Sequence, residues 1–200
     1  MAEIKLFGEW PTAGVEVKDP GLKKCINLAP VSVPKSGGKY ANQPFHKSKI
    51  NIVERLINKM MVPGHRGKKH VLTSGGACGN YLGNYKTVRN CFRMIEEKTK
   101  KNPVEVFIRA IENSALREEI AAYQVGGIIV RRAVIASPQR RVDTTLKNIV
   151  QASYRKSFGK KESMAGALAG ELIAAAANDA SKSESVKEKE RIEREAEGAR

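Results

Sequence analysis

The sequence contains no apolar run near the ~20 residues that a membrane-spanning helix requires. Its N-terminus also lacks the basic and then apolar order of a secretory signal peptide. Only three cysteines, Cys25, Cys78 and Cys91, occur among 200 residues, and no two of them form a Cys-x-x-Cys pair. These absences predict a cytosolic protein with reduced thiols and no membrane span.

Residue patterns typical of catalytic centres are also scarce. The three histidines fall in expected loops, and no Ser/His/Asp or Cys/His spacing stands out. A zinc site of His65, His70, Cys78 and Cys91 is the sharpest metal hypothesis, but it lacks the paired spacing of structural zinc sites. The glycine-rich stretch 73–84 could grip a phosphate, yet it lacks the Gly-Lys-Ser/Thr ending of a nucleotide-binding P-loop. We therefore expect that the protein is not an enzyme, that it has no catalytic residues, and that it binds no cofactor, metal or small-molecule substrate.

Positive charge, by contrast, is abundant. Lys and Arg total 36 against 21 Asp and Glu, which gives a formal net charge of +15 and a pI near 9.9. The excess lies in residues 1–161, whereas the remainder of the chain is weakly acidic. This balance indicates an anionic partner, with nucleic acid first and an anionic membrane surface second.

Residues 118–141 contain the one credible β-hairpin in a sequence that otherwise reads as helices. Runs rich in Ile, Val and Tyr flank a Gly-Gly pair at 126–127, which tolerates the positive φ that a two-residue turn needs. This turn places Ala122 opposite Arg131, and Arg131 and Arg132 on opposite faces of the ribbon. Because an isolated ribbon is marginally stable, one face should lie on the helices, while the other face or the tip meets an anionic partner.

Apolar residues that recur at intervals of three and four predict a mainly α fold, a bundle of about five to six helices with a protruding hairpin arm. Asn102-Pro103 and Ser137-Pro138 each supply an N-cap followed by proline at the first helical position. The expected helices cover residues 48–61, 85–101, 102–116, 137–158 and 163–177, and a further helix after residue 181 needs a partner or stays frayed.

The helix start at Ser137-Pro138 places two arginines, Arg140 and Arg141, in the first turn of that helix. Positive charges there oppose the helix dipole by a few tenths of a kcal/mol each. A bound phosphate would relieve that repulsion, so these arginines are candidate contacts for nucleic acid.

We divide the chain into a basic N-terminal extension at 1–47, a helical RNA-binding domain at 48–180 with its hairpin at 118–136, and a charged tail at 181–200. The piece 32–49 mixes lysines with Tyr40, Phe45 and His46. That mixture suits a segment that lies along RNA, where aromatic rings stack on bases and lysines meet phosphates. A floppy basic tail is the alternative.

Several motifs resemble a known family. The order of IVERLINKMM, IEEKTKKNPVEVFIRAIENSALRE, a ribbon with VGG at its tip, SPQRR at the start of the next helix and SMAGALAGEL resembles ribosomal protein S seven of the small subunit. The resemblance covers residues 49–177. The segment GEWPTAGVEVKDPGLKKCINLAP and the ending IEREAEGAR are similar to the archaeal and eukaryotic branch, and the archaeal one is preferred.

The resemblance implies a cytoplasmic ribosomal protein that binds small-subunit rRNA early, nucleates assembly of the head domain and adjoins other ribosomal proteins. It also implies a hairpin that faces tRNA and mRNA near the exit site through Tyr123, Gln124, Gly126, Gly127, Arg131 and Arg132. Either Gly67-Lys68-Lys69 or Gly83-Asn84-Tyr85-Lys86 would carry the family's rRNA contact after the first helix. The candidate rRNA-binding residues are Lys35, Lys39, Lys47, Lys49, Arg66, Lys68, Lys69, Lys86, Arg89, Arg140, Arg141, Arg155, Lys156, Lys160 and Lys161.

A different function, DNA bending by an architectural protein, would use the ribbon as a minor-groove arm. That function favours an apolar wedge at the tip and an obligate dimer. The Gly-Gly tip and the lack of an evident dimerisation helix disfavour it.

Overall fold

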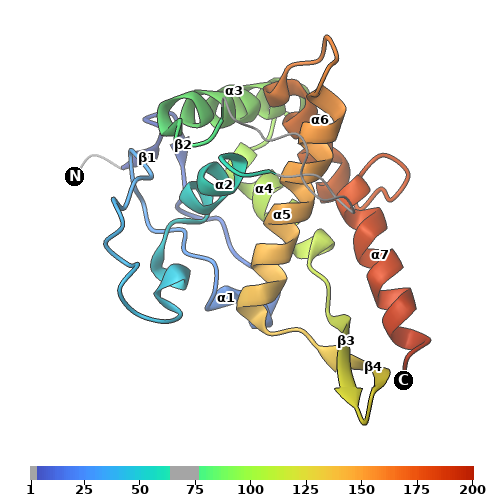
Figure 1. Cartoon of the computed structure of the whole chain (residues 1–200). Coiled ribbons are helices and arrows are strands. Elements are labelled where there is room, and N and C mark those ends of the chain that lie inside the picture. The colour runs from blue at the N-terminus through green and yellow to red at the C-terminus, as the bar shows by residue number, and fades with distance from the viewer. Residues whose placement is uncertain (1–3, 64–76) are drawn as a thin grey trace.

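A computed structural model describes residues 4–63 and 77–200, and these residues form a helical body from which one β-hairpin protrudes (Figure 1). The elements are β1 (Lys5–Leu6), β2 (Trp10–Pro11), α1 (Pro20–Lys23), the 3-10 helix η1 (His46–Lys49), α2 (Ile52–Met60), α3 (Tyr81–Thr99), α4 (Pro103–Ser114), β3 (Glu118–Val125), β4 (Ile128–Ile135), α5 (Pro138–Ser157), α6 (Met164–Ala176) and α7 (Glu184–Glu197). The mainly α fold with a protruding hairpin is thereby confirmed.

Capping side chains set where most of the helices begin. The Asn102 side chain accepts a hydrogen bond from Val104 N at 3.0 Å, so α4 starts as the sequence predicted. Ser137 occupies the N-cap of α5 before Pro138, but its side chain makes no capping bond. Asn51 and Asn80 cap α2 and α3, so the first begins after residue 48 and the second before residue 85.

The core lies where α3, α4 and α5 meet around α6. Phe92, Phe107, Leu146 and Leu168 are buried there, each on the apolar stripe of its helix. The alanine-rich α6 packs against all three of the other helices, because small side chains allow close approach. Burial of these large side chains supplies the main driving force for folding.

The N-terminal segment packs into this core, although the sequence suggested an extension. Leu6, Trp10 and Leu22 are buried, and the Trp10 ring lies edge-on to Phe92, with ring centroids 5.7 Å apart. The Trp10 indole N–H donates to Glu96 on α3 at 2.9 Å. The sequence did not indicate this packing, because the apolar residues of the N-terminal segment lie in short pieces separated by turns and follow no helical period.

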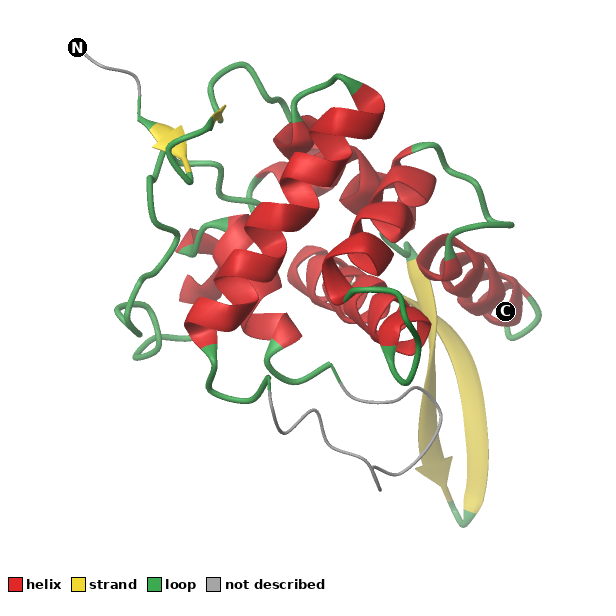
Figure 2. Ribbon diagram, turned by 90° about the horizontal axis from the view of Figure 1, so that it is seen from above, coloured by secondary structure: helices red, strands yellow, loops and turns green. Residues whose placement is uncertain are grey.

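The hairpin has the register that the sequence predicted. Ala121 pairs with Arg132 and Ala122 with Arg131, and both Gly126 and Gly127 have positive φ, at 55° and 87°. The outer halves of both strands are exposed on both faces, and the ribbon projects away from the helices (Figure 2). Near its base the hairpin packs against α7 rather than on the main helical body.

The C-terminal helix α7 finds its packing partner within the chain. Val186 and Ala196 are buried, while a polar network fastens the start of the helix. The fully buried Glu171 accepts hydrogen bonds from the Ser183 hydroxyl at 2.8 Å and from the Ser185 N–H at 2.9 Å. Buried carboxylates need such partners, so this network gives the polar helix a defined position.

Candidate nucleic-acid interface

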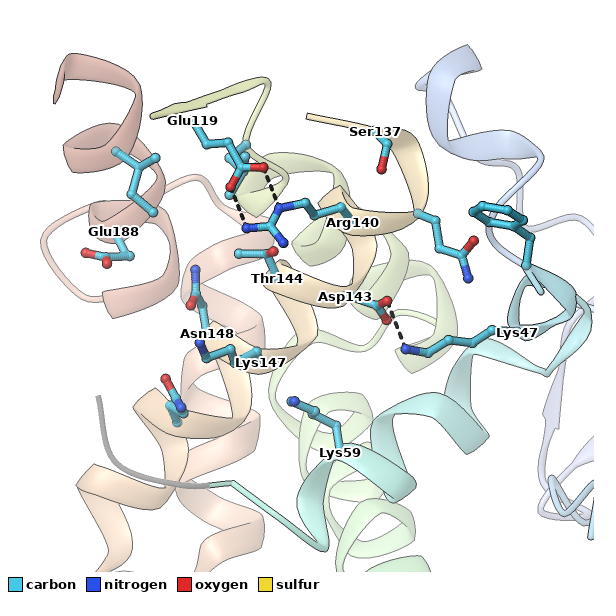
Figure 3. Close-up of a pocket in the computed structure, with 15 residues that line it drawn as sticks. Lys47, Lys59, Glu119, Ser137, Arg140, Asp143, Thr144, Lys147, Asn148 and Glu188 are labelled. Carbon is cyan, nitrogen blue, oxygen red and sulfur yellow. Dashed lines mark hydrogen bonds and ion pairs between the residues drawn. The ribbon is translucent and has the colours of Figure 1, made fainter. Parts of the chain in front are cut away.

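A groove of about 760 Å³ lies between α2, α5, α7 and the segment that precedes α2. Three lysines line it, and each comes from a different element: Lys47 from η1, Lys59 from the last turn of α2 and Lys147 from the middle of α5 (Figure 3). We call this feature the lysine groove. Lysines from separate elements meet here, so the fold creates the charged surface.

Helical spacing on α5 places its polar residues in this groove. Arg140, Asp143 and Lys147 recur at intervals of three and four, so they share one face of the helix. Val142 and Leu146 lie on the buried face. The helix α5 therefore presents charged side chains to the groove and apolar side chains to the core.

A carboxylate and two cations organise one wall of the groove. Asp143 accepts a hydrogen bond from the Lys47 ammonium at 2.8 Å and one from the Arg55 guanidinium at 2.9 Å. Burial acts to raise the pKa of Asp143, but the hydrogen bonds from Lys47 and Arg55 outweigh it and hold that pKa below its ordinary value. The ionised Asp143 thus anchors η1 to α5.

Lys59 and Lys147 supply further positive charge to the groove, which Glu188 on α7 also lines. Burial, together with the positive charges of Lys147 and Lys47, lowers the pKa of Lys59, and Asp143 offsets this only in part. An anion placed beside Lys59 would favour its charged form. A phosphate group has the charge and the acceptor oxygens for that position.

A second basic concavity of about 280 Å³ lies beside the N-terminal segment. Lys35, Lys39, Lys49 and Tyr40 contribute to its lining. The Lys35 ammonium lies 5.5 Å from the centre of the Tyr81 ring, a cation–π distance. These lysines are exposed, so they remain available to an external anion.

Besides Lys47, which binds Asp143, four more of the predicted site residues have close carboxylate partners within the chain. Arg141 is buried and donates to Asp19 at 2.7 Å and to the Leu116 carbonyl at 2.9 Å. These bonds give Arg141 an internal role that ties α1 to α5. The other pairs are Arg140 with Glu119, Arg89 with Glu9, and Lys156 with Glu171.

Other predicted residues are exposed and separate from the groove. Arg155 lies 3.7 Å from Glu184 but is 71% exposed. The remaining ones are Lys86, Lys160, Lys161 and, on the hairpin, Tyr123, Gln124, Gly126, Gly127, Arg131 and Arg132. Arg66, Lys68 and Lys69 lie outside the described residues, as do His65 and His70 of the zinc hypothesis.

Two groove residues, Lys59 and Lys147, are absent from the candidate rRNA-binding residues named above, although Lys147 belongs to the basic helix face that the sequence indicates as part of an RNA surface. Lys147 follows Arg140 by seven positions and could have been found from that helical spacing. Lys59 sits on a helix whose pattern indicated only core packing, and no sequence signal shows that α2 crosses beside α5.

The described residues contain neither a cluster of metal-ligating side chains nor a helix that could span a membrane. Among residues 4–63 and 77–200, no group of three or more His, Cys, Asp or Glu side chains is arranged to hold a metal ion. Cys78 is exposed, whereas Cys91 is buried and burial raises the pKa of its thiol. Over the same ranges no helix combines the length and the apolar character needed to cross a bilayer.

Comparison with known proteins gives one consistent family. The family model described as ribosomal protein S7p/S5e matches residues 23–200. Three archaeal relatives bear the name small ribosomal subunit protein uS7. The relative from Nanoarchaeum equitans is 44% identical over 99% of this chain and 100% of its own length. Those from Archaeoglobus fulgidus and Methanococcus maripaludis are 44% and 43% identical over 99% of this chain, and over 96% and 100% of their own.

Proposed function

The chain belongs to the ribosomal protein S7p/S5e family, and we propose that, as a structural constituent of the small ribosomal subunit, it holds rRNA in the lysine groove. Its role is therefore structural and not enzymatic, and its partners are small-subunit rRNA and neighbouring ribosomal proteins. The resemblance found in the sequence, including the archaeal branch, is confirmed.

The observation that carries the groove assignment is the convergence of Lys47, Lys59 and Lys147 on one concave surface. Each lysine that meets a phosphate displaces condensed counterions from the RNA, and this release favours binding. Burial and repulsion from the neighbouring lysines both lower the pKa of Lys59 in the free protein. The negative charge of a bound phosphate chain would offset this repulsion.

We propose that the N-terminal lysines extend the same surface. Lys35, Lys39 and Lys49 adjoin the second concavity, and Lys47 belongs to both the basic segment 32–49 and the lysine groove. An RNA strand could therefore pass from one concavity to the other. At the far end of α5, Arg155, Lys160 and Lys161 are exposed and would meet more distant phosphates.

We further propose that the hairpin meets tRNA and mRNA near the exit site. Arg131 and Arg132 are both exposed and, from the register, point to opposite faces of the ribbon. The exposed Tyr123 offers a ring for stacking on a base. An arm that projects beyond the helices can reach a second nucleic acid while the groove holds rRNA.

The groove assignment can be tested with a double variant, Lys59→Gln with Lys147→Gln. Binding to a head-domain fragment of small-subunit rRNA should weaken, and the slope of log K against log salt should fall by about 0.7 to 0.9 for each phosphate that is no longer bound. Lys98→Gln, an exposed position on α3 outside the groove, is the matched control. A double variant with the slope of the unchanged protein would rule out the groove as the rRNA site.

A further inference from the structure

Phe45 combines three features that set it apart from other exposed residues. Its side chain is 80% exposed, its backbone has a φ of 62°, and it lines the lysine groove. A lone exposed aromatic residue is ordinary on a protein surface. A bulky side chain in the left-handed region is unusual, because its Cβ crowds the backbone there.

Local hydrogen bonds hold Phe45 in this conformation. Its carbonyl accepts from the Ser48 N–H at 3.2 Å and from the Ser48 hydroxyl at 3.0 Å. Two residues later Lys47 binds Asp143 on α5 at 2.8 Å, so the turn that carries the ring is fastened to the groove wall. The backbone that carries the ring is thus anchored beside the groove, and the ring itself is largely open to solvent.

The groove supplies the complementary chemistry for a nucleotide. Its volume falls within the range of about 300 to 1,000 Å³ typical of small-molecule sites. Lys47, Lys59 and Lys147 can meet phosphate oxygens, and Gln139 lines the same surface with an amide that can bond to a base edge. An aromatic ring beside lysines is the arrangement by which proteins hold single-stranded nucleic acid.

We propose that Phe45 is a stacking platform for one unpaired base of the bound RNA, whose neighbouring phosphates lie among Lys47, Lys59 and Lys147. The base must be unpaired, because in a duplex both faces of each base are already stacked. This proposal rests on the proposed function, since it assumes that RNA occupies the lysine groove. It adds a site for a single nucleotide and a residue that selects for single-stranded structure.

Two variants of Phe45 distinguish the contribution of its aromatic ring to RNA binding from the contribution of its backbone turn. Phe45→Asn removes the ring but keeps a residue that tolerates the left-handed region, so the fold should be retained. Its affinity for the head-domain rRNA fragment should fall by about tenfold, in the range expected for one stacked base, at every salt concentration. The salt slope should stay unchanged, because no charge is removed.

Phe45→Trp keeps a stacking ring and provides an exposed fluorophore, whereas the native Trp10 is buried. Its affinity should match that of the unchanged protein within about twofold, and the rRNA fragment should quench its fluorescence, with the native protein as the control for Trp10. A fully paired RNA duplex of equal length should leave it unquenched.

The outcomes distinguish this proposal from the proposed function. If Phe45→Asn binds as tightly as the native protein, or if the duplex quenches Phe45→Trp as strongly as the rRNA fragment does, the stacking platform is wrong even though the groove still binds RNA. If the Lys59 and Lys147 double variant also keeps its salt slope, the proposed function fails at the groove itself.

Discussion

Arg140 and Glu119 join the first turn of α5 to the base of the hairpin by two hydrogen bonds, one of them 2.8 Å long from Nη2 to Oε2. The hydrogen bonds to Glu119 raise the pKa of Arg140 above its ordinary value. The Glu119 carboxylate therefore already relieves the repulsion for which the sequence suggested a bound phosphate. Arg140 lines the lysine groove but has a partner before any RNA binds.

Replacing this partner should increase the charge that the groove offers to RNA. In Glu119→Gln, the neutral amide leaves Arg140 available, so the salt slope of rRNA binding should steepen by up to about 0.7 to 0.9. Glu118→Gln is the matched control, because it removes the same charge one residue away but releases Arg200 outside the groove. Identical slopes in the two variants would show that Arg140 serves only to hold the hairpin.

Arg141→Ala should affect stability rather than RNA binding. The change leaves the Asp19 carboxylate and the Leu116 carbonyl without their shared donor. We expect urea denaturation to show a stability decrease of about 3 kcal/mol, the low end for a broken buried pair because Asp19 is partly exposed. Arg141→Lys should be less destabilising. A decrease below about 0.5 kcal/mol, the level of an ordinary surface change, would contradict the internal role.

Glu9 gives the fold a defined pH dependence. Hydrogen bonds from Arg93 and Arg89 outweigh the opposing effect of burial and lower its pKa from 4.5 to about 2. The folded state then binds this proton more weakly than the unfolded state. The contribution to the free energy of unfolding is fully present above pH 4.5 and is lost as the pH falls toward 2.

Urea midpoints of the native protein and of Glu9→Gln, measured across this pH range, test the effect. The native protein should be more stable above about pH 5, and the two curves should converge as the pH approaches 2. A constant difference across the range would mean that the ion pairs of Glu9 with the two arginines on α3 contribute nothing.

The outer part of the hairpin should be dispensable for folding and for most rRNA affinity. Deleting residues 123–125 and 128–130 keeps the Gly-Gly turn and joins it to the facing pair Ala122 and Arg131. The removed residues are exposed, so circular dichroism, the melting temperature and binding to the rRNA fragment should change little. Loss of cooperative unfolding in the shortened protein would disprove the description of the hairpin as an arm.

Much of the architecture could be predicted because local chemistry determined it. Gly126-Gly127 specified both the turn and the register, and Asn102-Pro103 specified the start of α4. The packing of Trp10 against Phe92 could not be predicted, because it joins residues far apart in sequence and has no period.

The candidate interface was predictable in kind but not in detail. Net charge and the motifs indicated RNA, yet nothing in the sequence showed that Arg141 is buried and bound to Asp19, which lies far from it in the chain. Lys59 could not be predicted as a groove residue for a similar reason. Its role in the groove depends on how α2 crosses α5, which only tertiary packing determines.

The most direct test of rRNA recognition compares binding of the full chain to a head-domain fragment of small-subunit rRNA and to duplex DNA of equal length, across a salt series. We predict a preference for the rRNA fragment that persists at high salt, because recognition of shape and unpaired bases adds to charge neutralisation. Equal affinities that collapse together as salt rises would show that only the net charge of +15 is recognised, and would contradict this prediction.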